Sequence, residues 1–171
     1  MGNIKANIVI STDGYIAHKD DDLSWIPSEL MQRIFKEYES ADVLLAGFNT
    51  YNYFYEHHAC WVFKNKSYIV SNYENALIPK ESLFLLHGNT IDAIEKIKAE
   101  NDNIMIVGGG KLITSLLNNQ LIDEIELYIV PVLLGEGIQF LGQTFDVRME
   151  LTACKQENNV AHLSYKVLGK K

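Results

Sequence analysis

The feature that most restricts the fold of this chain is a run of three glycines, Gly108, Gly109 and Gly110, between two apolar segments. Residues 104–107 before the run have the composition of a buried strand, and residues after it follow a helical pattern. Glycine adopts backbone conformations that other residues avoid, and a helix N-terminus presents free N–H groups. A strand that passes through such a turn into a helix therefore suits a phosphate or diphosphate. A tight turn without a ligand is the alternative explanation.

Two better-known phosphate motifs are excluded by single residues. The phosphate loop of nucleoside triphosphatases requires a glycine where Met105 stands and a hydroxyl residue where Leu112 stands. The common dinucleotide fingerprint requires a small residue where Ile113 stands. The sequence thus argues against a kinase or an ATPase and against an ordinary Rossmann turn.

Strand-like and helical segments alternate along most of the chain, which is typical of an α/β fold with a largely parallel sheet. The last part differs, because two segments of alternating apolar and polar residues flank Asn158 and Asn159, as in an antiparallel hairpin. We find no repeat and no linker, so we expect a single domain over residues 1–171. The predicted strands are 4–10, 42–46, 67–71, 82–86, 103–107 and 122–131, the predicted helices are 27–39, 89–100 and 110–119, and the predicted hairpin comprises 147–155 and 160–168.

Charge and composition narrow the range of partners. The net charge of −7 provides no basic surface for nucleic acid or an anionic membrane, and no apolar run is long enough to cross a bilayer. Cys60 and Cys154 lie far apart without metal-ligand spacing, and His57 and His58 point about 100° apart on a helix, so we expect no metal site. We expect a cytoplasmic protein with unpaired cysteines.

Two further turns follow predicted strands. Residues 11–17 combine Asp13 with Gly14, and residues 47–51 begin with glycine, after which Asn49 or Thr50 could cap a short aromatic helix that extends to His57. In open α/β sheets ligands bind at the carboxyl ends of the strands, where these turns and the glycine run all lie. A simple turn and a simple helix cap are the alternatives for each stretch taken alone.

Taken together, several motifs resemble the dihydrofolate reductase-like superfamily, and within it the RibD C-terminal branch of riboflavin-pathway aminopyrimidine reductases. The resemblance extends from residue 4 to about residue 142 and implies a three-layer α/β fold with helices on both faces of the sheet. The motifs are Ser11-x-Asp13-Gly14-x-Ile16-Ala17, Ala46-Gly47-x-x-Thr50-Tyr51, Tyr68-Ile-Val-Ser71, Val107-Gly108-Gly109-Gly110, Leu121-x-Asp123-Glu124 and Pro131-Val-Leu-Leu-Gly135-Glu-Gly137.

The resemblance implies that NADPH or NADH lies across the carboxyl edge of the sheet. By motif match, Ile16 and Ala17 flank the nicotinamide, and Ser71 with Asn72 border the adenosine ribose. The resemblance implies that the diphosphate is bound by Asn49, Thr50 and the glycines Gly108 to Gly110. The other residues of the implied cofactor site are Gly47, Val107, Lys111 and Leu112. The family's cis Gly-Gly bond corresponds here to Gly108-Gly109. Where the family often has basic residues that bind a 2′-phosphate, this chain has Phe48 and Asn72, so we expect little preference for NADPH over NADH.

Two carboxylates are catalytic candidates, Glu29 and Asp13. Glu29 follows Trp25 and Pro27 as the acid of folate reductases does, which would make it a proton donor. However, Glu29 points almost opposite to the apolar stripe of its helix, and Arg33 is four residues later, so a solvated ion pair is the alternative.

The expected function is hydride transfer from NADPH or NADH to a C=N or C=O carbon of a small substrate that resembles a pyrimidine or a pterin. Genuine folate reduction is not expected, because the arginine that binds the glutamate tail of folate has no match. The alternative is a catalytically silent nucleotide-binding module that acts as a sensor or partner protein. The aromatic stretch from Tyr51 to Phe63 is expected to divide between core and substrate cleft. We also expect a homodimer, because the apolar segment 128–134 would expose more apolar surface at a sheet margin than a monomer usually leaves.

Overall fold

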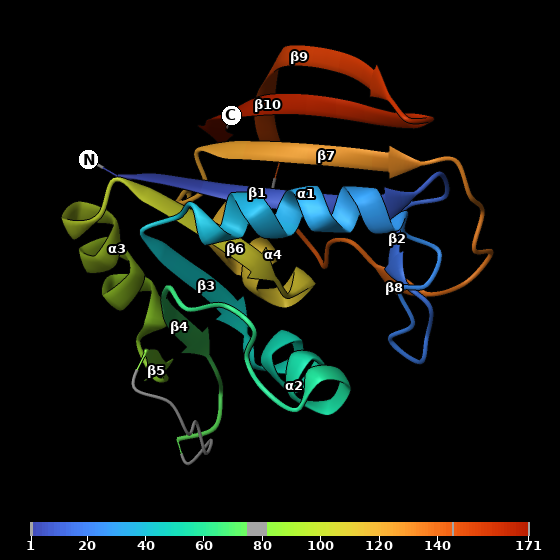
Figure 1. Cartoon of the computed structure of the whole chain (residues 1–171). Coiled ribbons are helices and arrows are strands. Elements are labelled where there is room, and N and C mark those ends of the chain that lie inside the picture. Colours follow the sequence, from blue (N-terminus) through green and yellow to red (C-terminus); the bar gives the residue numbers. More distant parts are fainter. Residues whose placement is uncertain (1, 75–81, 145, 171) are drawn as a thin grey trace.

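A computed structural model describes residues 2–74, 82–144 and 146–170. They form an eight-stranded sheet in the order β5-β4-β3-β6-β1-β7-β10-β9, and Figure 1 shows helices on both of its faces. The six strands from β5 to β7 run parallel, and β10 and β9 are antiparallel. The strands are β1 (Asn3–Ser11), β3 (Val43–Gly47), β4 (Lys66–Val70), β5 (Leu83–Leu86), β6 (Asn103–Gly108), β7 (Glu124–Val130), β9 (Val147–Glu157) and β10 (Val160–Lys170). The predicted mostly parallel sheet with a C-terminal hairpin is confirmed.

The helices are α1 (Ser28–Glu39), α2 (Phe48–His58), α3 (Thr90–Glu100) and α4 (Gly110–Asn118). Alternate residues of each strand point to opposite faces of a sheet, so one strand contributes to two cores. In β3, Val43 and Leu45 pack in the core under α3 and α4, whereas Leu44 and Ala46 pack in the core under α1 and α2. These three layers match the architecture that the resemblance implies.

Two short strands were not predicted. β2 (Tyr15–Ala17) pairs antiparallel with β8 (Ile138–Gln139) in a separate two-stranded sheet, visible at the right of Figure 1. Strands of three and two residues are too short to produce an alternating apolar pattern in the sequence. This small sheet connects the loop after β1 to the segment after β7.

The helices begin in different ways. The side chain of Asn89 accepts a hydrogen bond from the Asp92 N–H and caps α3. The cap predicted for the second helix is wrong, because α2 begins at Phe48 and its N-cap is Gly47, which has no side chain. Asn49 and Thr50 therefore lie inside the first turn of α2 and do not cap it.

The apolar strand on which the expected homodimer partly rests does not lie at the margin of the sheet. β7 lies inside the sheet between β1 and β10, and Tyr128 is fully buried. Within β7 the segment is apolar because both faces of the strand are covered, whereas Leu133 beyond the strand is 72% exposed. The two edge strands of the sheet are instead β5 and β9, and Met149 and Leu151 on β9 are exposed.

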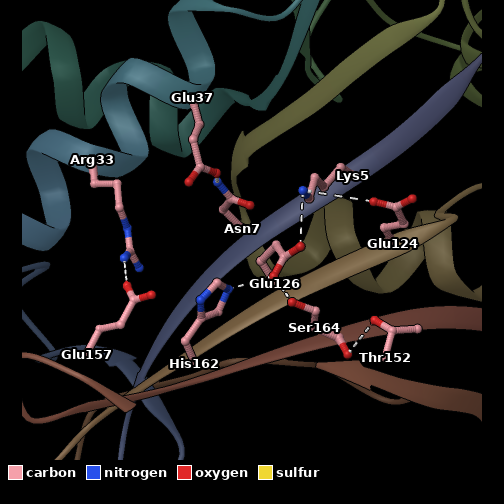
Figure 2. A network of polar contacts seen from close by, with 10 residues as sticks. All are labelled: Lys5, Asn7, Arg33, Glu37, Glu124, Glu126, Thr152, Glu157, His162 and Ser164. Carbon is pink, nitrogen blue, oxygen red and sulfur yellow. Dashed lines mark hydrogen bonds and ion pairs between the residues drawn. The ribbon is translucent and has the colours of Figure 1, made fainter. Parts of the chain in front are cut away.

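A network of polar side chains crosses β1, β7 and β10 on the face covered by α1 (Figure 2). Glu126 is at its centre, where it accepts hydrogen bonds from Ser164 (2.5 Å) and from Lys5 (3.1 Å) and lies 2.6 Å from the His162 ring nitrogen. Burial disfavours the charged carboxylate, but these hydrogen bonds outweigh it and hold the pKa of Glu126 below its ordinary value. The carboxylate is thus stabilised by folding.

Among the described residues, no helix is long and apolar enough to span a membrane. The same residues contain no cluster of histidine, cysteine, aspartate and glutamate that could hold a metal ion.

Candidate active site

A cavity of about 820 Å³ opens at the carboxyl ends of the parallel strands. Segments that follow β1, β3, β4 and β6 form its walls, as is usual for ligand sites of open α/β sheets. Every residue predicted to bind the cofactor lines this cavity: Ile16, Ala17, Gly47, Asn49, Thr50, Ser71, Asn72, Val107, Gly108, Gly109, Gly110, Lys111 and Leu112. The structure thus brings these residues together, and their contact with a cofactor is a prediction.

Two helix N-termini meet in the wall of the cavity. The N-caps of α2 and α4 are Gly47 and Gly109, and neither helix has a side chain that caps its first N–H groups. A Cβ atom on Gly109 would lie 3.3 Å from the Cα atom of Gly47, so larger residues would push the two turns apart. Free N–H groups at a helix N-terminus favour an anion, and here two such termini point to the same space. The donor set therefore fits the diphosphate of a dinucleotide.

The glycine turn needs glycine at each position for a different reason. Gly109 has φ of 105°, which residues with a side chain rarely adopt. A Cβ atom on Gly108 would lie 3.2 Å from the hydroxyl oxygen of Thr50, and one on Gly110 would lie 2.7 Å from the carbonyl oxygen of Phe140. The expected cis bond between Gly108 and Gly109 is not present, because the described residues contain no cis peptide bond. The positive φ angles of both glycines make the turn with trans bonds.

Asp13 does not line the cavity. Its carboxylate accepts hydrogen bonds from the Ser11 hydroxyl (2.6 Å) and from the N–H groups of Leu134 (3.1 Å) and Gly135 (2.7 Å). The Ser11 hydroxyl above all, followed by these N–H groups, keeps the pKa of Asp13 below its ordinary value. Through these hydrogen bonds Asp13 connects the turn after β1 to the segment after β7. Its surroundings favour the charged carboxylate, which cannot donate a proton.

Glu29 does not line the cavity either. It lies beside a separate small pocket of about 90 Å³, where its carboxylate accepts a hydrogen bond from Asn158 at the tip of the hairpin (3.2 Å). The alternative ion pair with Arg33 is wrong, because Arg33 pairs with Glu157. The structure places neither catalytic candidate next to the predicted cofactor site. The helix face that reaches the cavity carries Ile34, Phe35 and Tyr38 instead.

The sequence interpretation missed the inner end of the cavity. Asn7 of β1 and Tyr38 of α1 both line it, and both are buried. The Tyr38 hydroxyl donates a hydrogen bond to the Val107 carbonyl oxygen (3.4 Å). The signal in the sequence was Asn7 itself, a polar residue in the middle of an apolar strand. Within the aromatic stretch, Tyr53 and Phe54 line the cavity, whereas Trp61 and Phe63 belong to the core.

The outer end of the cavity contains the residues predicted near the adenosine ribose. Ser71 follows β4 and accepts a hydrogen bond from the Tyr73 N–H, and the Tyr73 ring lies 6.2 Å from the Phe48 ring. Two basic residues are candidates to replace the cations that are missing at Phe48 and Asn72. Lys66 begins β4 and lies about 16 Å from Ser71 at the usual rise of a strand, which is too far. His87 is nearer, because Leu86 accepts a hydrogen bond from the Ser71 N–H.

The sheet order, the hairpin and the two glycine-capped helices around one cavity define a protein of the dihydrofolate reductase-like fold. Dihydrofolate reductase from Enterococcus faecalis, solved with NADP(H) and RAB-propyl, has this fold, with a TM-score of 0.71 over 98% of this chain and 97% of that chain at 15% identity. Within this class, the chain belongs to the RibD C-terminal domain family, whose profile matches residues 3–163. The resemblance read from the motifs is confirmed.

Relatives of similar length are known. A provisionally described riboflavin biosynthesis protein from Shewanella sp. PV-4 is 26% identical and has a TM-score of 0.83, with 98% of this chain and 99% of that chain covered. The uncharacterized protein YwjB of Bacillus subtilis is 24% identical over 163 residues, 92% of this chain and 94% of its own length. The deaminase/5-amino-6-(5-phosphoribosylamino)uracil reductase of Thermotoga maritima shares the fold at 14% identity with a TM-score of 0.74, over 97% of this chain and 56% of that chain.

Proposed function

We propose that this protein is a reductase that uses NADH or NADPH to reduce a C=N or C=O bond of a small planar substrate, similar to a pyrimidine or a pterin. The chemistry that a reduced nicotinamide supplies when bound is hydride transfer. The single observation that carries the proposal is the meeting of two uncapped helix N-termini, at Gly47 and Gly109, in one cavity. Family membership supports the same reaction class.

The residues of the cavity have separate tasks in this proposal. The first turns of α2 and α4 bind the diphosphate through N–H groups, and Ile16 and Ala17 of β2 support the nicotinamide. The apolar side chains of α1 hold the substrate ring against it and exclude water, which fixes the reacting carbon near the cofactor. Orientation is therefore the main contribution of the protein.

The proton that completes the reduction comes from solvent in this proposal. The described residues that line the cavity include one carboxylate, Asp21, and one imidazole, His58, and both are exposed. The cavity thus offers no buried acid in the part of the chain that the structure describes.

A direct test of the proposed reductase function is to incubate the protein with reduced cofactor and a panel of aminopyrimidines, dihydropterins and small carbonyl compounds, and to follow loss of the nicotinamide absorbance. Turnover of a ring substrate supports the proposal, whereas reduction of none of them contradicts it.

The second candidate is a nucleotide-binding module without turnover. The observation in its favour is that both expected acids, Glu29 and Asp13, lie outside the cavity. Calorimetry and the absorbance panel together separate the two functions, because a silent module binds the cofactor in calorimetry but reduces no compound of the panel. We place either function in the cytoplasm, in accord with the free thiols of Cys60 and Cys154.

A further inference from the structure

The charges around the cavity are distributed unevenly. Among the described residues that line the cavity, Lys111 at the start of α4 is the one lysine, and none is an arginine. The two arginines of the chain lie elsewhere: Arg33 pairs with Glu157, and Arg148 is on the edge strand β9. Lys19, near the first loop, pairs with Glu136 at 2.5 Å. Among the described residues, a single lysine next to the predicted diphosphate site is thus left to line the cavity.

The mouth of the cavity next to α1 is acidic instead. Asp21 lines it, and Asp20 and Asp22 flank Asp21 in the sequence. Burial raises the pKa of Tyr53 on the opposite wall, and the negative charges of Asp22 and Asp21 raise it further. The carboxylates therefore act on the space between α1 and α2. A phosphate in this position would face like charges, and no described lysine or arginine lines this part of the cavity to balance them.

The inner end of the same cavity holds an acceptor without a partner. Asn7 is 6% exposed, and its amide nitrogen donates a hydrogen bond to Glu37 at 2.8 Å (Figure 2). Because Glu37 requires the donor end of the amide, the orientation of Asn7 is fixed. The amide oxygen is buried and has no hydrogen-bond partner among the described residues. Buried acceptors are nearly always satisfied, so this oxygen indicates a donor that the protein itself does not supply.

We infer that the substrate is an unphosphorylated heterocycle with an N–H donor, which Asn7 accepts, and that Asp21 disfavours phosphorylated analogues. This inference rests on the proposed reductase function and makes it more specific. The cavity thus differs from what a phosphoribosyl substrate requires, since phosphate groups are normally bound by arginine or lysine. An amino-substituted pyrimidine or its riboside meets both conditions.

The test compares binding of one aminopyrimidine riboside and its 5′-phosphate to the protein saturated with oxidised cofactor, by calorimetry. We expect the riboside to bind at least about tenfold more tightly, the size of one lost charge-assisted contact. Equal or tighter binding of the 5′-phosphate would overturn the inference, and so would a failure of both to bind. Because the readout is binding, an absence of turnover would count against the proposed reductase and leave the ligand preference measured.

Two variants assign the preference to these residues. Asp21→Lys should reduce the preference for the riboside by about tenfold or more, whereas Asp20→Lys, which adds the same charge outside the cavity lining, should change it little. Asn7→Leu should weaken riboside binding about tenfold and leave cofactor affinity unchanged, provided that its circular dichroism is that of the unmutated protein. If Asn7→Leu does not fold, Asn7→Ser keeps a small polar group and should show the same selective loss. Equal riboside affinity in a folded variant would remove Asn7 from the assignment.

Discussion

Gly47 and Gly109 face each other across the junction of α2 and α4, so closely that a Cβ atom on Gly109 would lie 3.3 Å from the Cα atom of Gly47. They are the N-caps of these two helices. The contact holds two sets of unpaired N–H groups at one end of the cavity. Cofactor binding is therefore expected to depend on the size of these residues more than on any single side chain.

Replacement of Gly109 by alanine should abolish binding of NADH and NADPH in calorimetry. The new methyl group would occupy a backbone with φ of 105° and would separate the two helix N-termini. Gly88→Ala is the matched control, since Gly88 also has a positive φ, 73°, but lies outside the cavity lining. Both variants should lose some thermal stability. Equal cofactor affinity in Gly109→Ala and the unmutated protein would remove the diphosphate assignment.

The preference for NADPH over NADH should be weak, below about tenfold in dissociation constant. Phe48 and Asn72 line the outer end of the cavity, and neither provides a positive charge for a 2′-phosphate. Asn72→Arg should raise the preference for NADPH by about tenfold to a hundredfold, while Lys66→Arg, at the opposite end of β4, should not. Titrations of both cofactors at one ionic strength measure this. A hundredfold preference in the unmutated protein would show that another cation, such as His87, contacts the phosphate.

Glu29→Gln should lower kcat by less than about threefold, because Glu29 contacts Asn158 and lies outside the large cavity. Loss of a true general acid typically reduces the rate by about a hundredfold or more. The pH profile of kcat provides the second readout, and it should keep the same shape in the variant. A large loss of kcat together with a vanished acidic limb would restore Glu29 as the proton donor.

Glu126→Gln should destabilise the protein at neutral pH and much less in acid. Folding lowers the pKa of Glu126 from its ordinary value of 4.5, so its contribution is complete above that value and is lost as the pH falls through the folded pKa. Urea unfolding of both proteins across this range should therefore give curves that converge at low pH. Glu124→Gln is the control, since Glu124 is half exposed and lies 3.9 Å from Lys5. A difference that is constant with pH would contradict the assignment.

The protein should form a homodimer with a mass about twice 19.4 kDa in light scattering. β9 is the edge strand of the sheet, and Leu151 on it is 52% exposed. An unpaired edge with exposed apolar side chains favours pairing with a second copy. Leu151→Lys should shift the mass toward the monomer, whereas Leu133→Lys, at a leucine outside β9 that is 72% exposed, should not. A monomer mass for the unmutated protein would refute the prediction.

The sequence predicted those parts of the molecule that depend on local patterns. Long strands such as β1 and the hairpin carry alternating apolar residues, and the glycine run follows a buried strand, so their positions could be predicted. The roles of Asp13 and Glu29 could not, because they depend on Leu134 and Asn158, which are distant in the sequence. Asn7 was missed for the same reason, since only the packing of α1 on β1 gives its amide a buried environment.

The position of β1 has a consequence for the synthesis of the protein. β1 leaves the ribosome before the strands that it pairs with, β6 on one side and β7 on the other, and β7 ends at Val130. Until most of the chain has been made, the apolar face of β1, formed by Ile4, Ala6, Ile8 and Ile10, has no permanent neighbour. We therefore expect nascent chains that end before β6 to bind chaperones and to be sensitive to proteases. The large cavity is then completed late in translation, when β8 pairs with β2.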